Sequence, residues 1–138
     1  ILWLRPTNPL RCLNTFNKAF NIFKKNQETV LIVHETDSRL FYRDKKLLKP
    51  LNKKFNKSSM LRGQDVAPFY QIFSGEFFKY KNLYNKKFLG KKKRFVIAPS
   101  LTKFDIDSES DILFLKFLLE NYPRKYNKYL HKIYEFNS

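Results

Sequence analysis

The sequence predicts an α+β fold: a small antiparallel β-sheet with a hairpin near residues 69–81, flanked by N-terminal and C-terminal helices. Towards both ends of the chain, apolar residues recur at intervals of three and four, as they do on one face of a helix. Between these regions lie short β-branched and aromatic runs, which are typical of strands. With 138 residues, of which 43 % are hydrophobic, the chain suffices for one domain with a packed core.

The N-terminal part of the chain predicts a helix and then a buried strand. A helix over about residues 10–25 has Lys24 and Lys25 in its last turn, where cations suit the helix dipole. Its apolar stripe comprises Leu10, Leu13, Phe16, Phe20 and Phe23. Residues 29–33 are a β-branched run that predicts a buried strand. Residues 45–48 allow a helical turn, which Pro50 would end.

Two strand-like runs in the middle of the chain predict a β-hairpin. Residues 69–73 and 77–81 are rich in aromatic residues, and a short turn containing Gly75 separates them. The second run alternates aromatic residues with Lys79 and Lys81. Because successive side chains of a strand point to opposite faces, we expect one apolar and one cationic face on this hairpin.

The C-terminal part predicts two helices. An acidic patch precedes the first helix and consists of Asp105, Asp107, Glu109 and Asp111. Ser108 or Ser110 can cap this helix, and the acids then lie in its first turn. Its apolar residues are Ile112, Leu115, Leu118 and Leu119. Pro123 interrupts it, and a last helix over about residues 124–136 places on one face Tyr126, Tyr129, Leu130, Ile133 and Phe136.

The charge of the chain is large and localised. The formal net charge is +16, which favours nucleic acid or an acidic membrane surface as a partner. Residues 49–103 hold 14 basic and two acidic residues and therefore carry most of this excess. We expect three segments: an N-terminal extension (1–48) containing the helix at about 10–25, a basic RNA-binding core (49–103), and a helical C-terminal extension (104–138).

Composition argues against an enzyme. Three glycines leave no glycine-rich phosphate loop, and a single cysteine, Cys12, leaves no intramolecular disulfide and no multi-cysteine metal site. His34 and His131 lie far apart and away from any nucleophile pattern. A nuclease or RNA-modifying enzyme would need carboxylate or histidine clusters, and the acidic patch fits a helix start better. We expect no catalysis, no cofactor and no metal.

Lysine clusters within the basic segment predict an RNA-binding surface, because Lys and Arg neutralise phosphates and release counterions, and serine hydroxyls add phosphate contacts. The candidate RNA-binding residues are Lys53, Lys54, Lys57, Ser58, Ser59, Arg62, Lys79, Lys81, Lys86, Lys87, Lys91, Lys92, Lys93 and Arg94. A solvated charged face is the alternative for any single lysine run. Codon bias adds weight to that alternative, since 64 residues are Phe, Tyr, Lys, Asn or Ile, which A- and T-rich codons encode.

Four stretches of the basic segment follow one another in a recognisable order: Lys49-Pro50-Leu51, Asn56-Lys57-Ser58-Ser59-Met60, Val66-Ala67-Pro68-Phe69-Tyr70-Gln71-Ile72-Phe73-Ser74-Gly75 and Leu89-Gly90-Lys91-Lys92-Lys93-Arg94-Phe95. In these places the chain resembles the small-subunit ribosomal protein nineteen family in its bacterial and organellar form. The family carries Lys-Pro-Leu, Arg-Arg-Ser-Ser/Thr-Ile, Val-Gly-x-x-Phe-x-Val-Tyr-Asn-Gly and Gly-His-Lys-Leu/Phe-Gly-Glu-Phe there. The resemblance covers residues 49–95, about a third of the chain.

The resemblance implies a structural constituent of the head of the small ribosomal subunit, without catalysis. The partners it implies are small-subunit rRNA and neighbouring head proteins, including ribosomal protein thirteen. The RNA would be bound through the basic hairpin and the turn that follows it. With the codon bias, the resemblance favours a mitochondrial ribosome of a protist. A basic peripheral protein on an acidic membrane surface, or a subunit of another RNA–protein assembly, remains the alternative.

Overall fold

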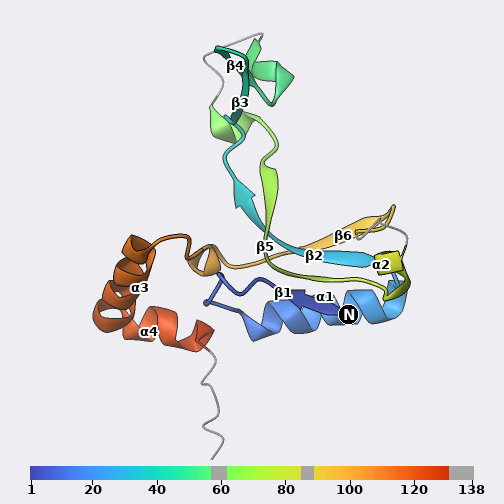
Figure 1. Cartoon of the computed structure of the whole chain (residues 1–138), viewed down its shortest axis with the longest axis vertical. Helices are drawn as coiled ribbons and strands as arrows, with labels where there is room; N and C mark the ends of the chain where they lie inside the picture. Colours follow the sequence, from blue (N-terminus) through green and yellow to red (C-terminus); the bar gives the residue numbers. More distant parts are fainter. Residues whose placement is uncertain (57–61, 85–88, 131–138) are drawn as a thin grey trace, which may run out of the picture. The chain divides into compact units, whose positions relative to one another are not determined.

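The chain folds into two compact units that contain both helices and strands, which confirms the predicted α+β class (Figure 1). This computed structural model describes residues 1–56, 62–84 and 89–130. The first unit consists of Ile1–His34 and Ile72–Ser138, and the second of Glu35–Gln71. The first unit therefore draws on all three segments expected from the sequence.

A four-stranded sheet with the order β1-β5-β2-β6 forms the centre of the first unit. Its strands are β1 (Leu2–Leu4), β2 (Thr29–Thr36), β5 (Phe69–Phe77) and β6 (Lys93–Ile97). β1 pairs with β5 in antiparallel orientation, whereas β2 pairs with β6 in parallel orientation. The sheet is therefore mixed: the predicted antiparallel pairing holds for β1 with β5 but not for β2 with β6. The strand predicted at residues 29–33 is confirmed in β2, whose first six residues are buried between two neighbouring strands.

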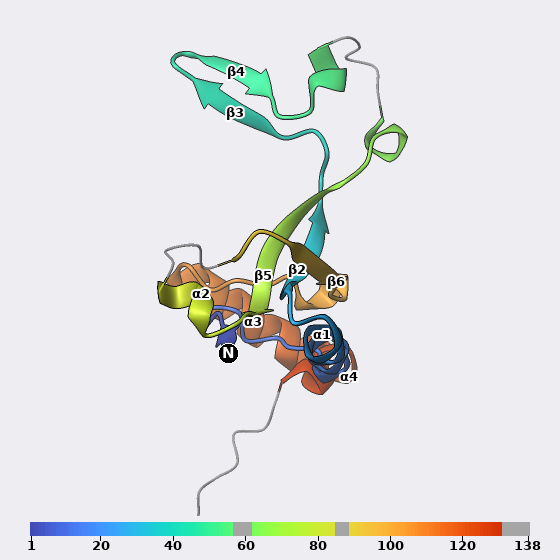
Figure 2. The same cartoon turned by 90° about the vertical axis from the view of Figure 1, so that its right-hand side faces the viewer.

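Helix α1 (Leu13–Asn26) packs against this sheet and confirms the helix predicted at about residues 10–25 (Figure 2). The core between them contains Ala19, Val30, Ile32, Phe77 and Ala98, with Phe16, Ile22, Phe23 and Val96 packed against it. The face turned to the sheet is centred on the small, buried side chains of Thr15 and Ala19, which allow the helix to approach closely. For this reason the predicted stripe is only partly correct: Leu13 and Phe20 are about half exposed.

The hairpin predicted near residues 69–81 is wrong, because residues Phe69–Phe77 form one continuous strand, β5. Gly75 lies inside this strand, opposite Leu4 of β1, and does not form a turn. A Cβ atom at Gly75 would stand 2.7 Å from the backbone oxygen of Trp3. The glycine is therefore needed for the close approach of two strands.

The run after β5 does not continue as a second hairpin arm. Phe78 is fully buried directly after the strand, and Lys81 begins the one-turn helix α2 (Lys81–Tyr84). The alternation of aromatic residues with Lys79 and Lys81 therefore does not create the two-faced strand that was predicted.

The second unit contains the hairpin that the structure does have, formed by β3 (Phe41–Asp44) and β4 (Leu47–Pro50). Asp44 pairs with Leu47, so the chain reverses through two residues, of which Lys45 has a positive φ of 55°. The helical turn considered at residues 45–48 is therefore wrong. Two 3₁₀ turns follow in this unit, η1 (Lys53–Asn56) and η2 (Gly63–Asp65).

The C-terminal part contains η3 (Ser100–Thr102), α3 (Glu109–Asn121), α4 (Pro123–Tyr126) and η4 (Asn127–Tyr129). Ser108 caps α3 as predicted, since its backbone N–H donates to the Asp111 carboxylate at 2.8 Å. Hydrogen bonds from the Ser108 hydroxyl and from backbone N–H groups lower the pKa of Asp111. The predicted last helix is shorter, with α4 passing into η4, and residues 131–136 lie outside the described part of the chain.

A second, smaller core holds α3 and α4 against the N-terminal segment. Leu10, Leu115 and Tyr129 are buried in it. Around them pack Cys12, Phe104, Ile106, Leu119, Tyr126 and Leu130.

His34, near the end of β2, is buried next to η3. Its Nε2 atom lies 3.4 Å from Oγ1 of Thr102, and its ring meets the ring of Phe73 edge-on at 5.1 Å between centroids. Burial, and to a lesser extent the charge of Lys103, lowers the pKa of His34 to about 4. The imidazole is therefore neutral in the folded protein at neutral pH.

We predict that Gly75→Ala loosens β1 and destabilises the fold by about 1–3 kcal/mol, as overpacked sites do. Trp3, the one tryptophan of the chain, reports on β1 directly. Its fluorescence should become easier to quench with acrylamide, and the melting temperature should fall. Ser74→Ala is the matched control, since the buried Ser74 hydroxyl has no hydrogen-bond partner among the described residues. Equal quenching in the two variants would contradict this role of Gly75.

A second prediction concerns acid stability. Because the folded-state pKa of His34 lies below its unfolded value of 6.5, the unfolded chain binds a proton first as the pH falls. The contribution of His34 to the free energy of unfolding should be fully present above pH 6.5 and should decrease towards pH 4, by up to about 3 kcal/mol. Urea unfolding at several pH values measures this slope. His34→Gln should flatten the slope in this window, and an unchanged slope would show that other groups cause it.

Candidate nucleic-acid interface

The basic strand β6 lies at the edge of the first unit's sheet, with β2 as its neighbour. Lys93 stands opposite Thr29 and Arg94 opposite Val30 in the parallel pairing. Lys91, Lys92, Lys93 and Arg94 are all exposed, because Lys91 and Lys92 precede the strand and the strand itself lies at an edge. Four consecutive cations are thus presented along one border of the sheet.

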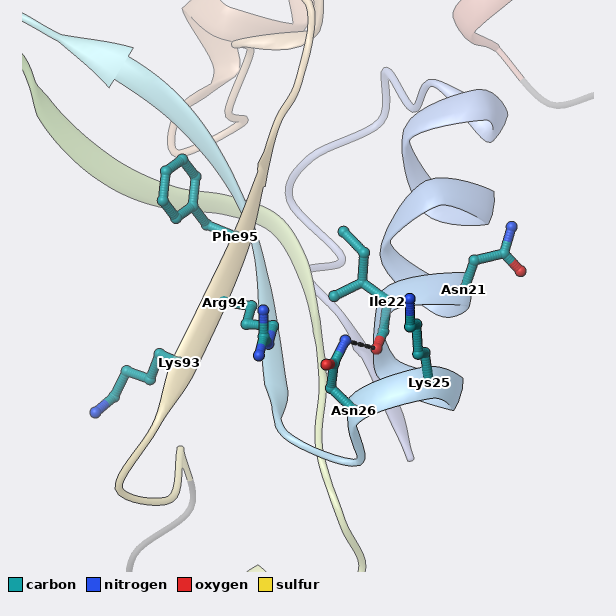
Figure 3. A pocket seen from close by; sticks show the side chains of 7 residues that line it. All are labelled: Asn21, Ile22, Lys25, Asn26, Lys93, Arg94 and Phe95. Carbon is teal, nitrogen blue, oxygen red and sulfur yellow. Dashed lines mark hydrogen bonds between the residues drawn. The ribbon is translucent and has the colours of Figure 1, made fainter.

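The parallel pairing also brings the last turn of α1 to this border. Since α1 ends at Asn26 and β2 begins at Thr29, the end of the helix meets the start of β6. An open groove of about 630 Å³ runs between the two elements (Figure 3). It is lined by Asn21, Ile22, Lys25, Asn26, Lys93, Arg94 and Phe95.

Side chains of β6 alternate across this edge, so the cations reach both sides of the strand. Figure 3 shows Arg94 on the side of β6 that faces α1, whereas Lys93 and Phe95 point away from the helix. The ring of Phe95 is 52 % exposed. A polyanion passing over this edge would meet cations on both faces of the sheet.

One acid moderates the charge of the groove. Glu28 follows the end of α1 and accepts a hydrogen bond from Nε of Arg94 at 2.6 Å, while Nζ of Lys92 lies 3.9 Å from it. The Glu28 side chain is only 24 % exposed, so this ion pair fixes the direction of the Arg94 guanidinium. Lys25 and Lys93, which also line the groove, are exposed.

Helix α2 lies close to the turn that leads into β6. Gly90 adopts a positive φ of 63° in this turn, and a Cβ there would stand 3.2 Å from Nδ2 of Asn82 in α2. The predicted site residue Lys81, at the start of α2, is exposed, and Lys79 is partly buried before it. The structure therefore gathers Lys81 and residues 91–94 at the same end of the sheet.

The remaining predicted site residues lie elsewhere or are not described. Lys53 and Lys54 are exposed on η1 of the second unit, where Arg62 also lies. The guanidinium of Arg62 pairs with Asp65 at 3.3 Å. Lys57, Ser58, Ser59, Lys86 and Lys87 lie outside the described residues.

Sequence reasoning missed the contribution of α1 to the groove. In the sequence, the helix dipole alone accounts for Lys25, and nothing marks Asn21 or Asn26, yet all three line the groove. Their role depends on the pairing of β2 with β6, whose partners are more than 60 residues apart in the chain. Neither the buried strand β2 nor the basic strand β6 carries a sequence signal of their parallel orientation.

The described residues give no support to a metal site or a membrane span. Among residues 1–56, 62–84 and 89–130, no group of three or more His, Cys, Asp or Glu side chains could hold a metal ion. In the same part of the chain, no helix combines the length and the apolar character needed to cross a membrane. Comparison with models of protein families finds no match to this chain, and comparison with curated proteins finds none either.

We predict that replacing Lys91, Lys92, Lys93 and Arg94 by Ala weakens binding to an oligouridine strand at least tenfold. For single strands, each lost phosphate contact reduces the slope of log binding constant against log salt concentration by about 0.7 in magnitude. Four lost contacts should therefore reduce this slope by roughly 2–3. Fluorescence anisotropy at several salt concentrations measures both quantities.

The control removes the same net charge from another part of the first unit. It replaces by Ala the exposed residues Lys116, Arg124, Lys125 and Lys128. Equal losses in the two variants would mean that net charge alone, and not the groove, determines RNA binding.

Proposed function

We propose that the chain binds RNA through the groove between α1 and β6 and serves as a structural constituent of the small subunit of a mitochondrial ribosome. One observation carries the RNA-binding part of this proposal. The parallel pairing of β2 with β6 brings Lys25, in the last turn of α1, into one groove with Lys93 and Arg94, which belong to the four consecutive cations at residues 91–94.

This arrangement suits a phosphate backbone better than a small anion. The groove is open, and its cations are exposed on two different elements. Exposed Lys and Arg side chains neutralise phosphates and release the counterions condensed on the strand, so affinity grows with the number of contacts along it. Asn21 also lines the groove, and amide groups can hydrogen-bond to phosphate or sugar oxygens, whereas Nδ2 of Asn26 already donates to the Ile22 carbonyl at 2.9 Å.

The ribosomal setting rests on the family resemblance of residues 49–95. Two of the four matching stretches contribute to the sheet, since residues 66–75 run into β5 and residues 89–95 run into β6. In this proposal the partners are small-subunit rRNA and head proteins such as ribosomal protein thirteen. The role is structural, with no reaction and no cofactor.

The alternative of an acidic membrane surface receives less support. Peripheral binding by an amphipathic helix requires its apolar face to reach the lipid. Phe16, Ala19, Ile22 and Phe23 of α1 instead pack in the core against the sheet, which leaves only Leu13 and Phe20 of its apolar residues about half exposed. Helix α3 does expose apolar residues, but Glu109 and Asp111 lie in its first turn and would be repelled by anionic lipid.

Sedimentation of a mitochondrial lysate on a density gradient tests this function. We expect the chain to migrate with the small ribosomal subunit and to leave that position after ribonuclease treatment. Flotation with vesicles containing phosphatidylserine forms the second arm. Binding to these vesicles with migration at the top of the gradient would favour the membrane alternative and contradict the proposal.

A further inference from the structure

Helix α3 presents large apolar side chains to solvent on the side opposite its own core. Leu115 and Leu119 face inward, where they pack in the cluster around Leu10. On the outer side, Leu113, Phe114 and Phe117 are 63 %, 54 % and 50 % exposed. We call these three residues the outer face of α3.

The outer face belongs to an ordered row of aromatic rings. Phe104 stacks on Phe114 with 6.1 Å between ring centroids, and Phe114 stacks on Phe117 at 6.5 Å. Tyr122 meets Phe117 nearly at a right angle at 6.4 Å. Because these rings support one another, the outer face is held in place before any partner arrives.

A helix that is apolar on both sides is normally buried on both sides. Exposed contiguous apolar patches of this kind mark interaction surfaces on soluble proteins. Aromatic residues, Phe among them, are also enriched in protein interfaces relative to the rest of the surface. The question is therefore which partner covers the outer face.

The charges around α3 discriminate between partners. Asp107, Glu109 and Asp111 lie at the start of the helix, with Asp107 and Glu109 exposed. Carboxylates at this place repel the phosphates of RNA and of anionic lipid, and they attract cations. A second copy of the chain is disfavoured, because each copy carries a net charge of +16.

We propose that the outer face of α3 docks a partner protein that presents an apolar helix with Lys or Arg at the end that meets the acidic start of α3. The apolar stripe of that helix covers Phe114 and Phe117, and its cations pair with Asp107 and Glu109. This surface is separate from the groove between α1 and β6, so the two proposals can fail independently.

Two synthetic amphipathic helices test the stated chemistry on the full chain. Both carry the same leucine stripe, but one ends in lysines and the other in glutamates. We expect the lysine-ended peptide to bind about tenfold more tightly, because its charges complement those at the start of α3. The preference should shrink at high salt and in Asp107→Asn/Glu109→Gln.

Leu113→Ser/Phe117→Ser removes the apolar contact without touching the inner core. It should abolish binding of the lysine-ended peptide while oligouridine binding and the circular dichroism spectrum stay unchanged. The matched control, Lys116→Ser/Glu120→Ser, changes two exposed residues of the same helix and no net charge, and it should bind the peptide as the parent does.

Three results would overturn this inference. The first is that neither peptide binds, and the second is that both bind equally, which would show nonspecific apolar adhesion. The third is a concentration-dependent dimer in analytical ultracentrifugation that Leu113→Ser/Phe117→Ser abolishes. In that case a second copy of the chain would be the occupant of the outer face.

Discussion

The parallel pairing of β2 with β6 is the constraint on which the candidate interface depends. It places Thr29 opposite Lys93, and because Thr29 follows α1 so closely, the last turn of the helix must lie beside the basic strand. Glu28, in the short link between α1 and β2, pairs with Arg94 and so ties the end of α1 to β6. A shift of register by one residue would turn Arg94 and Val96 away from α1, which would break the Arg94–Glu28 ion pair and force the larger Phe95 ring into the place of Val96 in the core.

The same sheet explains how so cationic a chain forms a core. Apolar residues from α1, β2 and β5 are buried on one side, while the cations collect at an edge where exposure costs little. Gly75 permits β1 to close the opposite edge, and Arg5 pairs with the buried carboxylate of Glu76 at 2.7 Å. The proposed RNA contacts and the closure of the sheet by β1 therefore lie at opposite edges of one sheet.

Features that depend on local chemistry could be predicted from the sequence. The helix before residue 26, the buried strand at Thr29 and the Ser108 cap all follow from spacing or capping chemistry. Tertiary features could not. A glycine after an aromatic run is typical of a turn, but Gly75 is required by the close approach of the β1 backbone. Likewise, the end of α1 lies beside β6 only because β2 and β6, far apart in the sequence, pair with each other.

Protein–RNA crosslinking tests the central claim most directly. The chain would be irradiated in complex with oligouridine, digested with chymotrypsin and analysed by mass spectrometry. The account predicts crosslinked peptides from the last turn of α1 and from residues 91–95, diminished at high salt. Crosslinks confined to α3, or to the hairpin of β3 and β4, would contradict it.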